Sequence, residues 1–101
     1  MINEIRKAFE ENRYEYSLHA VDQSIIRYIT RKEIHETIDE GEIIEDYPAD
    51  KYGPSCLICG TTKSGRWLHI HCSYASRYKI KIITLYEPNP NEWIEYKIRR
   101  K

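Results

Sequence analysis

The sequence lacks the features of a membrane, secreted or disordered protein. Its 101 residues contain only four glycines and four prolines, and no apolar run approaches the length needed to cross a membrane. The first ten residues, MINEIRKAFE, mix charged and apolar side chains and have no signal-peptide core. Three cysteines, an odd number, fit free thiols in a reducing compartment better than a disulfide framework. We therefore expect one folded, cytoplasmic domain over residues 1–101.

The sequence also lacks an excess of charge and the usual nucleotide-binding motifs. Its 16 basic and 16 acidic residues cancel, so net charge gives no argument for a nucleic-acid partner. It has no glycine-rich phosphate loop, no nucleophile elbow and no acidic cluster of the kind that holds magnesium. Nucleotide hydrolysis and two-metal chemistry are therefore poorly supported, and we expect no cofactor.

Helical spacing is the first positive signal along the chain. Ile2, Ile5 and Phe9 recur on one face of a short amphipathic helix. Ser17 is a suitable N-cap for a second helix, over residues 18–28. Both helices carry enough apolar side chains to pack against a sheet or a partner.

A third helix has the clearest local start. Thr30 is a typical N-cap residue, and Glu33 stands three positions later, as a capping box requires. We expect this helix over residues 31–40, with Gly41 as a left-handed terminator.

The rest of the chain changes from helical spacing to the alternation typical of strands. A short alternation at residues 14–16 is followed by four predicted strands, at Glu42–Tyr47, Ser55–Gly60, Arg66–Tyr74 and Lys79–Tyr86. Their connections are too short for crossover helices and suit antiparallel neighbours. The segment around Trp93 is expected to fold back before the basic C-terminal residues. The predicted fold class is α+β, with N-terminal helices followed by a mostly antiparallel, twisted sheet of four to five strands.

Two histidines share one face of the third main strand. Strand alternation puts His69 and His71 beside Trp67, while the aliphatic residues between them should face the core. Imidazoles titrate near neutral pH and suit proton transfer. The alternative is plain cross-strand packing of exposed aromatic side chains. A metal site on the two histidines would lack an evident third ligand.

A cysteine pair invites a zinc interpretation, which strand geometry disfavours. Cys56 and Cys59 have the spacing of half a zinc site. In an extended strand, however, residues three apart point to opposite faces, and Leu57-Ile58 is poor turn chemistry. Buried thiols are the better interpretation, and no metal site is predicted.

His19 and several basic residues are candidates for an anion-binding surface. His19 falls in the first turn of the second helix, where the helix dipole disfavours a protonated imidazole. It is expected to be neutral, either as a structural hydrogen-bonding group or as a base. Cations that could hold phosphate include Arg27, Arg31, Arg66, Lys79 and Lys81. Nine tyrosines and two tryptophans could stack on bases, although charge-balanced proteins carry such residues anyway.

The order of short motifs between Tyr14 and Trp93 resembles a known family. The motifs are Ser17-x-His19-Ala20, Arg27-x-Ile29-Thr30, Gly41-x-Ile43-Ile44, Ser55-x-Leu57-x-x-Gly60, Arg66-x-Leu68-His69-Ile70 and Tyr86-x-Pro88. Together they are similar to the bacterial and archaeal domain of unknown function family 4258. Its members resemble the RelE/ParE superfamily of toxin-like domains, small α+β proteins often encoded beside an antitoxin.

This resemblance implies the toxin component of a toxin–antitoxin pair, with a RelE-like fold and a metal-independent endoribonuclease activity. Its partners would be RNA or the ribosome and a cognate antitoxin protein. The catalytic candidates are then His19, His69, His71 and Tyr86, and the phosphate-binding candidates are Arg27, Arg31, Arg66, Lys79 and Lys81. His71 has no secure counterpart in the family and is included because it shares a face with His69.

Two points qualify this interpretation. Gln23 stands where family members often carry a basic residue, which weakens the second helix as a phosphate-binding surface. Relatives of one fold also act through protein contacts alone. The alternative function is therefore a non-catalytic protein-binding or regulatory module that uses the helical hairpin or an exposed sheet edge.

Overall fold

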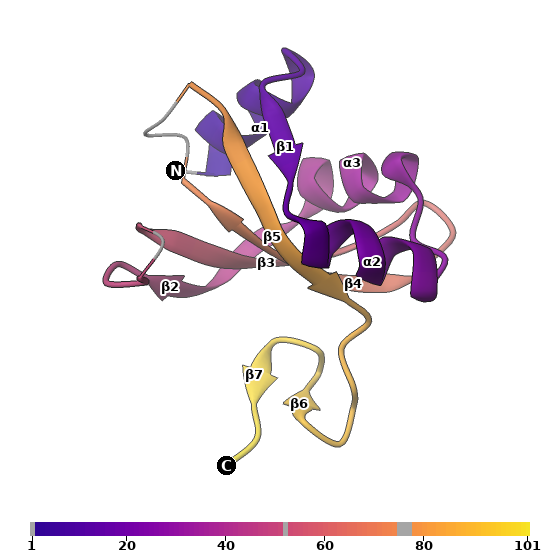
Figure 1. Ribbon diagram of the computed structural model, residues 1–101. Coiled ribbons are helices and arrows are strands. Elements are labelled where there is room, and N and C mark those ends of the chain that lie inside the picture. Colours follow the sequence, from indigo (N-terminus) through magenta and orange to yellow (C-terminus); the bar gives the residue numbers. More distant parts are fainter. Residues whose placement is uncertain (1, 52, 75–77) are drawn as a thin grey trace.

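The computed structural model describes residues 2–51, 53–74 and 78–101 and has an α+β fold (Figure 1). The described residues form three α-helices, a five-stranded sheet and a C-terminal hairpin. In chain order the elements are α1 (Ile2–Glu10), β1 (Tyr14–Tyr16), α2 (Leu18–Ile26), α3 (Arg31–Glu40), β2 (Glu42–Tyr47), β3 (Ser55–Thr61), β4 (Trp67–Ser73), β5 (Ile80–Tyr86), β6 (Trp93–Ile94) and β7 (Ile98–Arg99). The predicted connection at residues 75–77 lies outside the described residues.

The sheet is mixed, which corrects the prediction of a mostly antiparallel sheet. Its strand order is β1-β5-β4-β3-β2, and the last four strands in this order pair antiparallel as a meander. The short strand β1 instead pairs parallel with β5, with Tyr14 opposite Ile80. Everything from α2 to β4 lies between these two strands in the sequence, so their pairing could not be read from local turn lengths.

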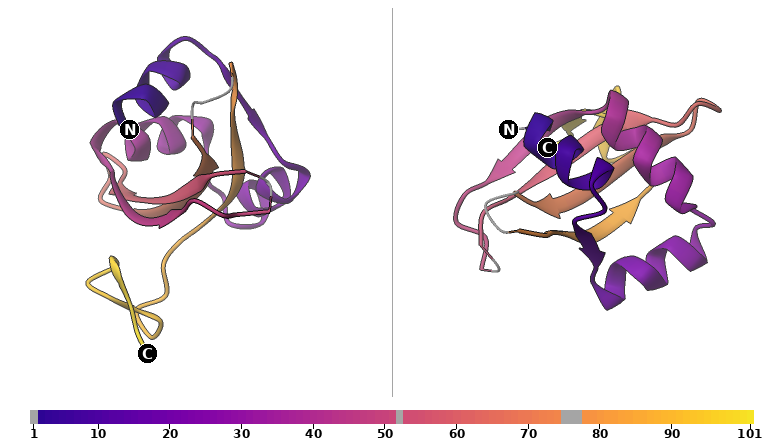
Figure 2. Two further views of the ribbon diagram at one scale, coloured as in Figure 1. Left: turned by 90° about the vertical axis from the view of Figure 1, so that its left-hand side faces the viewer. Right: turned by 90° about the horizontal axis from the view of Figure 1, so that it is seen from above.

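The core lies between one face of the sheet and the helices α1 and α3 (Figure 2). Alternate residues of β4, namely Leu68, Ile70 and Cys72, are fully buried on this face, as their spacing predicts. The amphipathic stripe of α1 is buried through Ile5 and Phe9. The helix α2 lies at the β5 end of the sheet, where it contacts β5 and β1.

The C-terminal hairpin β6–β7 lies on the opposite side of the sheet from α1 and α3 (Figures 1 and 2). The ring of Tyr96 stacks on Trp67 with centroids 4.7 Å apart, and Trp93 packs edge-on against His69 at 4.5 Å. The Cys59 thiol donates to the Tyr96 carbonyl oxygen at 3.4 Å. The predicted fold-back around Trp93 is therefore confirmed. The hairpin covers part of the sheet face that points away from the core, and we call this the open face.

The start of α3 is as predicted, but the role of Gly41 at its end is different. Thr30 and Glu33 form the complete capping box. Gly41 has φ −82°, which is extended rather than left-handed backbone. Its missing side chain matters for a different reason: a Cβ there would lie 2.5 Å from the Thr37 carbonyl oxygen and 2.8 Å from the Ile58 side chain. Glycine thus allows the end of α3 to pack directly against β3.

The cysteines agree with a further expectation. Cys56, Cys59 and Cys72 are free and buried, as the odd cysteine count suggested. Cys56 belongs to the core cluster, whereas Cys59 contacts the hairpin on the open face, so the two thiols point to opposite sides of β3. Within the described residues, no helix combines the length and apolar character that a membrane crossing requires.

Candidate functional site

The open face of the sheet carries several of the predicted site residues. His69 is directly opposite Tyr86 across β4 and β5, and His71 is opposite Thr84. Lys81 lies between the buried core residues Ile80 and Ile82, so it also faces this side. The prediction that His69 and His71 share a face opposite the aliphatic core is confirmed.

His69 is enclosed rather than available to a substrate. It is fully buried, its Nε2 lies 2.5 Å from the Tyr96 carbonyl oxygen, and its Nδ1 lies 3.2 Å from the Tyr86 hydroxyl. Because a carbonyl can only accept, Nε2 must carry a proton, and Nδ1 of the neutral ring then accepts from Tyr86. Burial lowers the pKa of His69, against the opposing effect of the Tyr96 carbonyl. This histidine joins the hairpin to the sheet.

His71 belongs to a second polar group on the same face. Its Nε2 lies 2.9 Å from Ser55 Oγ, and the buried Ser55 hydroxyl donates to Asp50 Oδ2 at 2.7 Å. The His71 nitrogen is also 3.5 Å from this carboxylate oxygen. Burial lowers the pKa of His71, although the Asp50 charge acts in the other direction. The three side chains attach the connection that follows β2 to the strands β3 and β4.

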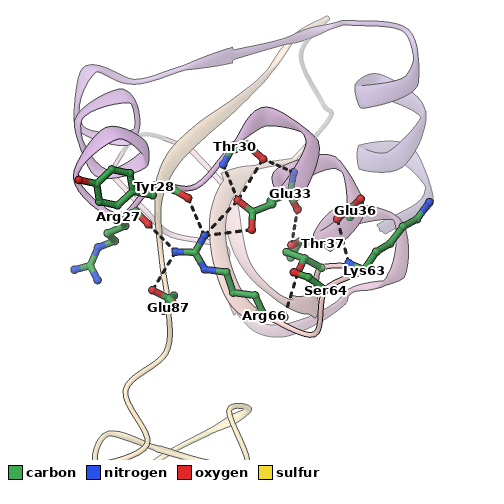
Figure 3. Close-up of polar contacts among 11 residues, drawn as sticks. Arg27, Tyr28, Thr30, Glu33, Glu36, Thr37, Lys63, Ser64, Arg66 and Glu87 are labelled. Carbon is green, nitrogen blue, oxygen red and sulfur yellow. Dashed lines mark hydrogen bonds and ion pairs between the residues drawn. The ribbon is translucent and has the colours of Figure 1, made fainter.

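Arg66 is engaged within the fold, as Figure 3 shows. Its Nη1 donates to the Tyr28 carbonyl oxygen at 2.9 Å and contacts the Glu33 carboxylate at 3.2 Å. Its Nη2 donates to the Arg27 carbonyl oxygen at 2.6 Å and to Glu87 Oε1 at 3.1 Å. The guanidinium therefore connects the α2–α3 link to the residue that follows β5.

Arg66 lowers the pKa values of the two carboxylates that it contacts, Glu33 and Glu87. The Arg66 hydrogen bond lowers the pKa of Glu87. For Glu33, burial acts to raise the pKa, but hydrogen bonds from the Thr30 backbone and from Arg66 lower it overall. Both carboxylates are thus held in the charged form that the guanidinium needs.

Arg27 and Arg31 are exposed, but each has a partner. Arg27 Nε donates to Gln23 Oε1 at 2.7 Å, and its side chain points away from the Arg66 cluster in Figure 3. Arg31 Nε donates to the Tyr14 hydroxyl at 2.6 Å, and its guanidinium carbon lies 5.4 Å from the centre of that ring. Neither arginine lines the cavity described next.

A cavity of about 660 Å³ lies where the first turn of α2 meets β5. Its walls are formed by Glu15, Ser17, His19, Lys51, Gly53, Ser73, Lys79, Lys81 and Ile83. Three predicted site residues, His19, Lys79 and Lys81, are among them. Within the part of the chain that the structure describes, the side chains of these three form no hydrogen bond or ion pair, whereas the other six predicted residues all do. The cavity therefore collects the predicted groups that remain available for a ligand.

Ser17 fixes the geometry of this cavity. As the N-cap of α2, its hydroxyl accepts from the Ala20 backbone N–H at 3.0 Å and donates to the Ile83 carbonyl oxygen at 2.7 Å. Its own backbone N–H donates to the Ile82 carbonyl oxygen at 2.9 Å. The turn that carries His19 is thus held against β5, the strand that carries Lys81 and directly follows Lys79.

Several residues that line the cavity were not predicted from the sequence, and the local sequence contained a recognisable pattern for only some of them. Glu15 alternates with two tyrosines, so a strand at residues 14–16 would have placed it on the open face. Ser17 was recognised only as a cap. Lys51 and Ser73 reach the cavity through tertiary structure, and nothing in the local sequence indicated this.

The chemistry of the cavity suits an anion. Three lysines and one histidine line it, and the N-terminus of α2 adds partial positive charge. Among the residues with defined positions, no group of three or more His, Cys, Asp and Glu side chains could hold a metal ion. The arrangement offers cations for a phosphate and an imidazole for proton transfer.

The fold and this cavity define a small α+β domain with a cationic cavity at the junction of a helix start and a sheet strand. Residues 16–87 match the family described as Domain of unknown function (DUF4258), and the chain belongs to that family. No curated protein and no solved structure matches it. The matched region contains His19, Lys79 and Lys81 but neither Glu15 nor the hairpin β6–β7.

Proposed function

We propose that the chain binds single-stranded RNA in this cavity and cleaves it without a metal ion, as the toxin component of a toxin–antitoxin pair. The observation that carries the proposal is the convergence of His19, Lys79 and Lys81 on one cavity, with side chains that form no hydrogen bond or ion pair to the residues that the structure describes. The resemblance of the family to RelE/ParE toxin-like domains supports RNA, or RNA on the ribosome, as the target.

The lysines are placed to hold the phosphate backbone. Lys81 lies in β5, and Lys79 directly precedes that strand, so the two lysines are two positions apart at its start. Both are exposed, and both line the cavity. Charge-assisted contacts of this kind bind phosphate without reading sequence.

His19 is the group assigned to proton transfer. As a base it takes the proton from a ribose 2′-hydroxyl, and the 2′-oxygen attacks the adjacent phosphorus. The bond to the 5′-oxygen of the next nucleotide then breaks, and that oxygen takes a proton from water in the open cavity. The products are a 2′,3′-cyclic phosphate and a 5′-hydroxyl end. The lysines stabilise the negative charge that builds on the phosphate oxygens.

The test is cleavage of defined single-stranded RNAs in EDTA. We expect His19→Ala to lower the cleavage rate by about 100-fold or more, as the loss of an acid–base group does. Lys79→Ala and Lys81→Ala should weaken RNA binding and reduce its dependence on salt. Lys32→Ala is the matched control, because Lys32 is also exposed but lies outside the cavity. Absence of cleavage by the wild type, with and without ribosomes, would contradict the nuclease proposal.

A second candidate function, a protein-binding module, is favoured by an exposed apolar face on α2 and the residues that directly follow it. Leu18 and Tyr28 are 85% exposed, and Ile25 and Ile26 are 67% exposed. Apolar side chains gathered in this way are typical of a protein interface. If this face binds a cognate antitoxin encoded beside the chain, Ile25→Asp should abolish the complex with that protein. The control Lys32→Ala should leave the complex intact.

A further inference from the structure

One charge in the cavity does not fit a site for phosphate alone. Glu15 lines the same walls as Lys51, Lys79 and Lys81. A carboxylate repels a phosphate group, so a cavity that binds only phosphate is better without it. A mixed set of charges instead suits a ligand that carries an anion and, next to it, a hydrogen-bond donor.

The position of Glu15 is fixed by its neighbours. Tyr14 and Tyr16 pack against the core, so the residue between them faces the other side of β1. Glu15 is exposed, and its direct neighbour across the parallel pair is Lys81. Within the described residues its side chain forms no hydrogen bond or ion pair, not even with that lysine. Charged residues on edge strands often form ion pairs across the strands, but Glu15 does not form such a pair with Lys81.

We propose that Glu15 accepts a hydrogen bond from a ribose 2′-hydroxyl and thereby selects RNA over DNA. This inference rests on the proposed function and names the group of the ligand that the same cavity recognises. A ribose bound beside a phosphate supplies both required groups, an anion for the lysines and a hydroxyl donor for the carboxylate. The 2′-hydroxyl is also the group by which proteins distinguish RNA from DNA.

The roles of Glu15 and His19 are compatible because every RNA nucleotide carries a 2′-hydroxyl. Glu15 binds the hydroxyl of the nucleotide beside the cleaved one, whereas His19 deprotonates the hydroxyl at the cleavage point. The two residues come from the middle of β1 and the first turn of α2, and the Ser17 cap holds that turn on β5. A strand of linked nucleotides can therefore meet both.

The test compares the binding of three oligonucleotides of one sequence: RNA, DNA and 2′-O-methyl RNA. All proteins carry His19→Ala so that the RNA stays intact, and dissociation constants are measured by fluorescence anisotropy. With Glu15 present, RNA should bind about tenfold more tightly than DNA, the effect of one hydrogen bond to a charged group. The 2′-O-methyl RNA should bind as weakly as DNA, because it keeps the ribose but has lost the donor.

Two variants isolate the carboxylate. Glu15→Ala should bring the RNA-to-DNA affinity ratio to about one and leave or raise DNA affinity, whereas Glu15→Gln, which keeps a neutral acceptor, should retain part of the preference. Glu10→Ala makes the same charge change on the exposed surface of α1 and should leave the ratio unchanged. Thermal unfolding of each variant verifies the fold.

The outcomes separate this inference from the function on which it rests. An RNA-to-DNA ratio that Glu15→Ala leaves unchanged overturns the role of Glu15 alone, as does 2′-O-methyl RNA that binds as tightly as RNA. If none of the three oligonucleotides binds, the proposed RNA function fails and the role of Glu15 fails with it.

Discussion

At the scale of single residues, the guanidinium of Arg66 shows how one side chain can join distant parts of a small fold. It contacts two backbone carbonyl oxygens at the α2–α3 link and two carboxylates, Glu33 and Glu87. A planar guanidinium can donate in several fixed directions at once, and a lysine ammonium cannot reproduce that pattern. The residue is about one-fifth exposed, so part of each ion pair is screened by water.

We therefore expect Arg66→Ala to lower the free energy of unfolding by about 2 kcal/mol, through the lost hydrogen bonds and the two carboxylates left without their cation. Arg66→Lys should recover less than half of this. Urea unfolding measures both. Arg27→Ala is the matched control, because among the described residues the exposed Arg27 side chain bonds only Gln23, and it should change stability by less than about 0.5 kcal/mol. Equal stability of the two alanine variants would contradict the joining role.

At the scale of elements, the contact between α3 and β3 depends on two glycines that face each other. A Cβ on Gly60 would lie 2.5 Å from the Thr37 carbonyl oxygen and 3.0 Å from the Gly41 Cα atom. The obstacles are backbone atoms, which cannot rotate away. Arg6 completes this junction, since its Nη2 donates to the Gly41 carbonyl oxygen at 2.8 Å.

Gly60→Ala should accordingly destabilise the protein by about 2–3 kcal/mol, because α3 must shift away from the sheet. The control is Gly65→Ala: nothing lies within 4 Å of a Cβ there, and only its φ of +87° adds strain, about 1–2 kcal/mol. Thermal unfolding of the two variants gives the comparison. A Gly60→Ala protein more stable than Gly65→Ala would show that the close approach is not required.

At the scale of the whole molecule, one buried and two half-buried histidines make stability depend on pH. Burial is the main cause that lowers the pKa of His35, His69 and His71 below the ordinary value of 6.5. In the unfolded chain these imidazoles take up protons as the pH falls below 6.5. In the folded protein they become protonated only at lower pH. The unfolded state therefore binds more protons in this window, and stability is lost as pH falls. Glu33, Glu45 and Glu87, whose pKa values are lowered from 4.5, extend the loss to more acidic pH.

The expected result is a melting temperature that is highest above about pH 7 and falls steadily toward pH 4. The free energy of unfolding falls by up to about 1.4 kcal/mol per pH unit for each histidine. His69→Phe, which keeps an aromatic ring against Trp93, should flatten the part of the curve just below pH 6.5. Calorimetry across this range measures it. A melting temperature constant between about pH 7 and pH 5 would contradict the account.

Local signals in the sequence were enough for the elements but not for their assembly. The Thr30 capping box and the alternation in β4 depend on neighbouring residues, and both were predicted correctly. The parallel pairing of β1 with β5 joins segments far apart in the chain, so no local pattern revealed it. The same limit applied to the site: Arg66 and Lys79 look alike as basic residues, and only their three-dimensional neighbours show that Arg66 is already engaged.

The pairing of β1 with β5 also determines when the cavity can exist during protein synthesis. Glu15 and His19 leave the ribosome before β5 does, and Ser17 can bond the carbonyl oxygens of Ile82 and Ile83 only after β5 has emerged. Until then the lysine wall is missing as well. A nascent or prematurely terminated chain that ends before β5 would therefore lack the cavity altogether, so the binding site exists only on chains that have been synthesised past Tyr86.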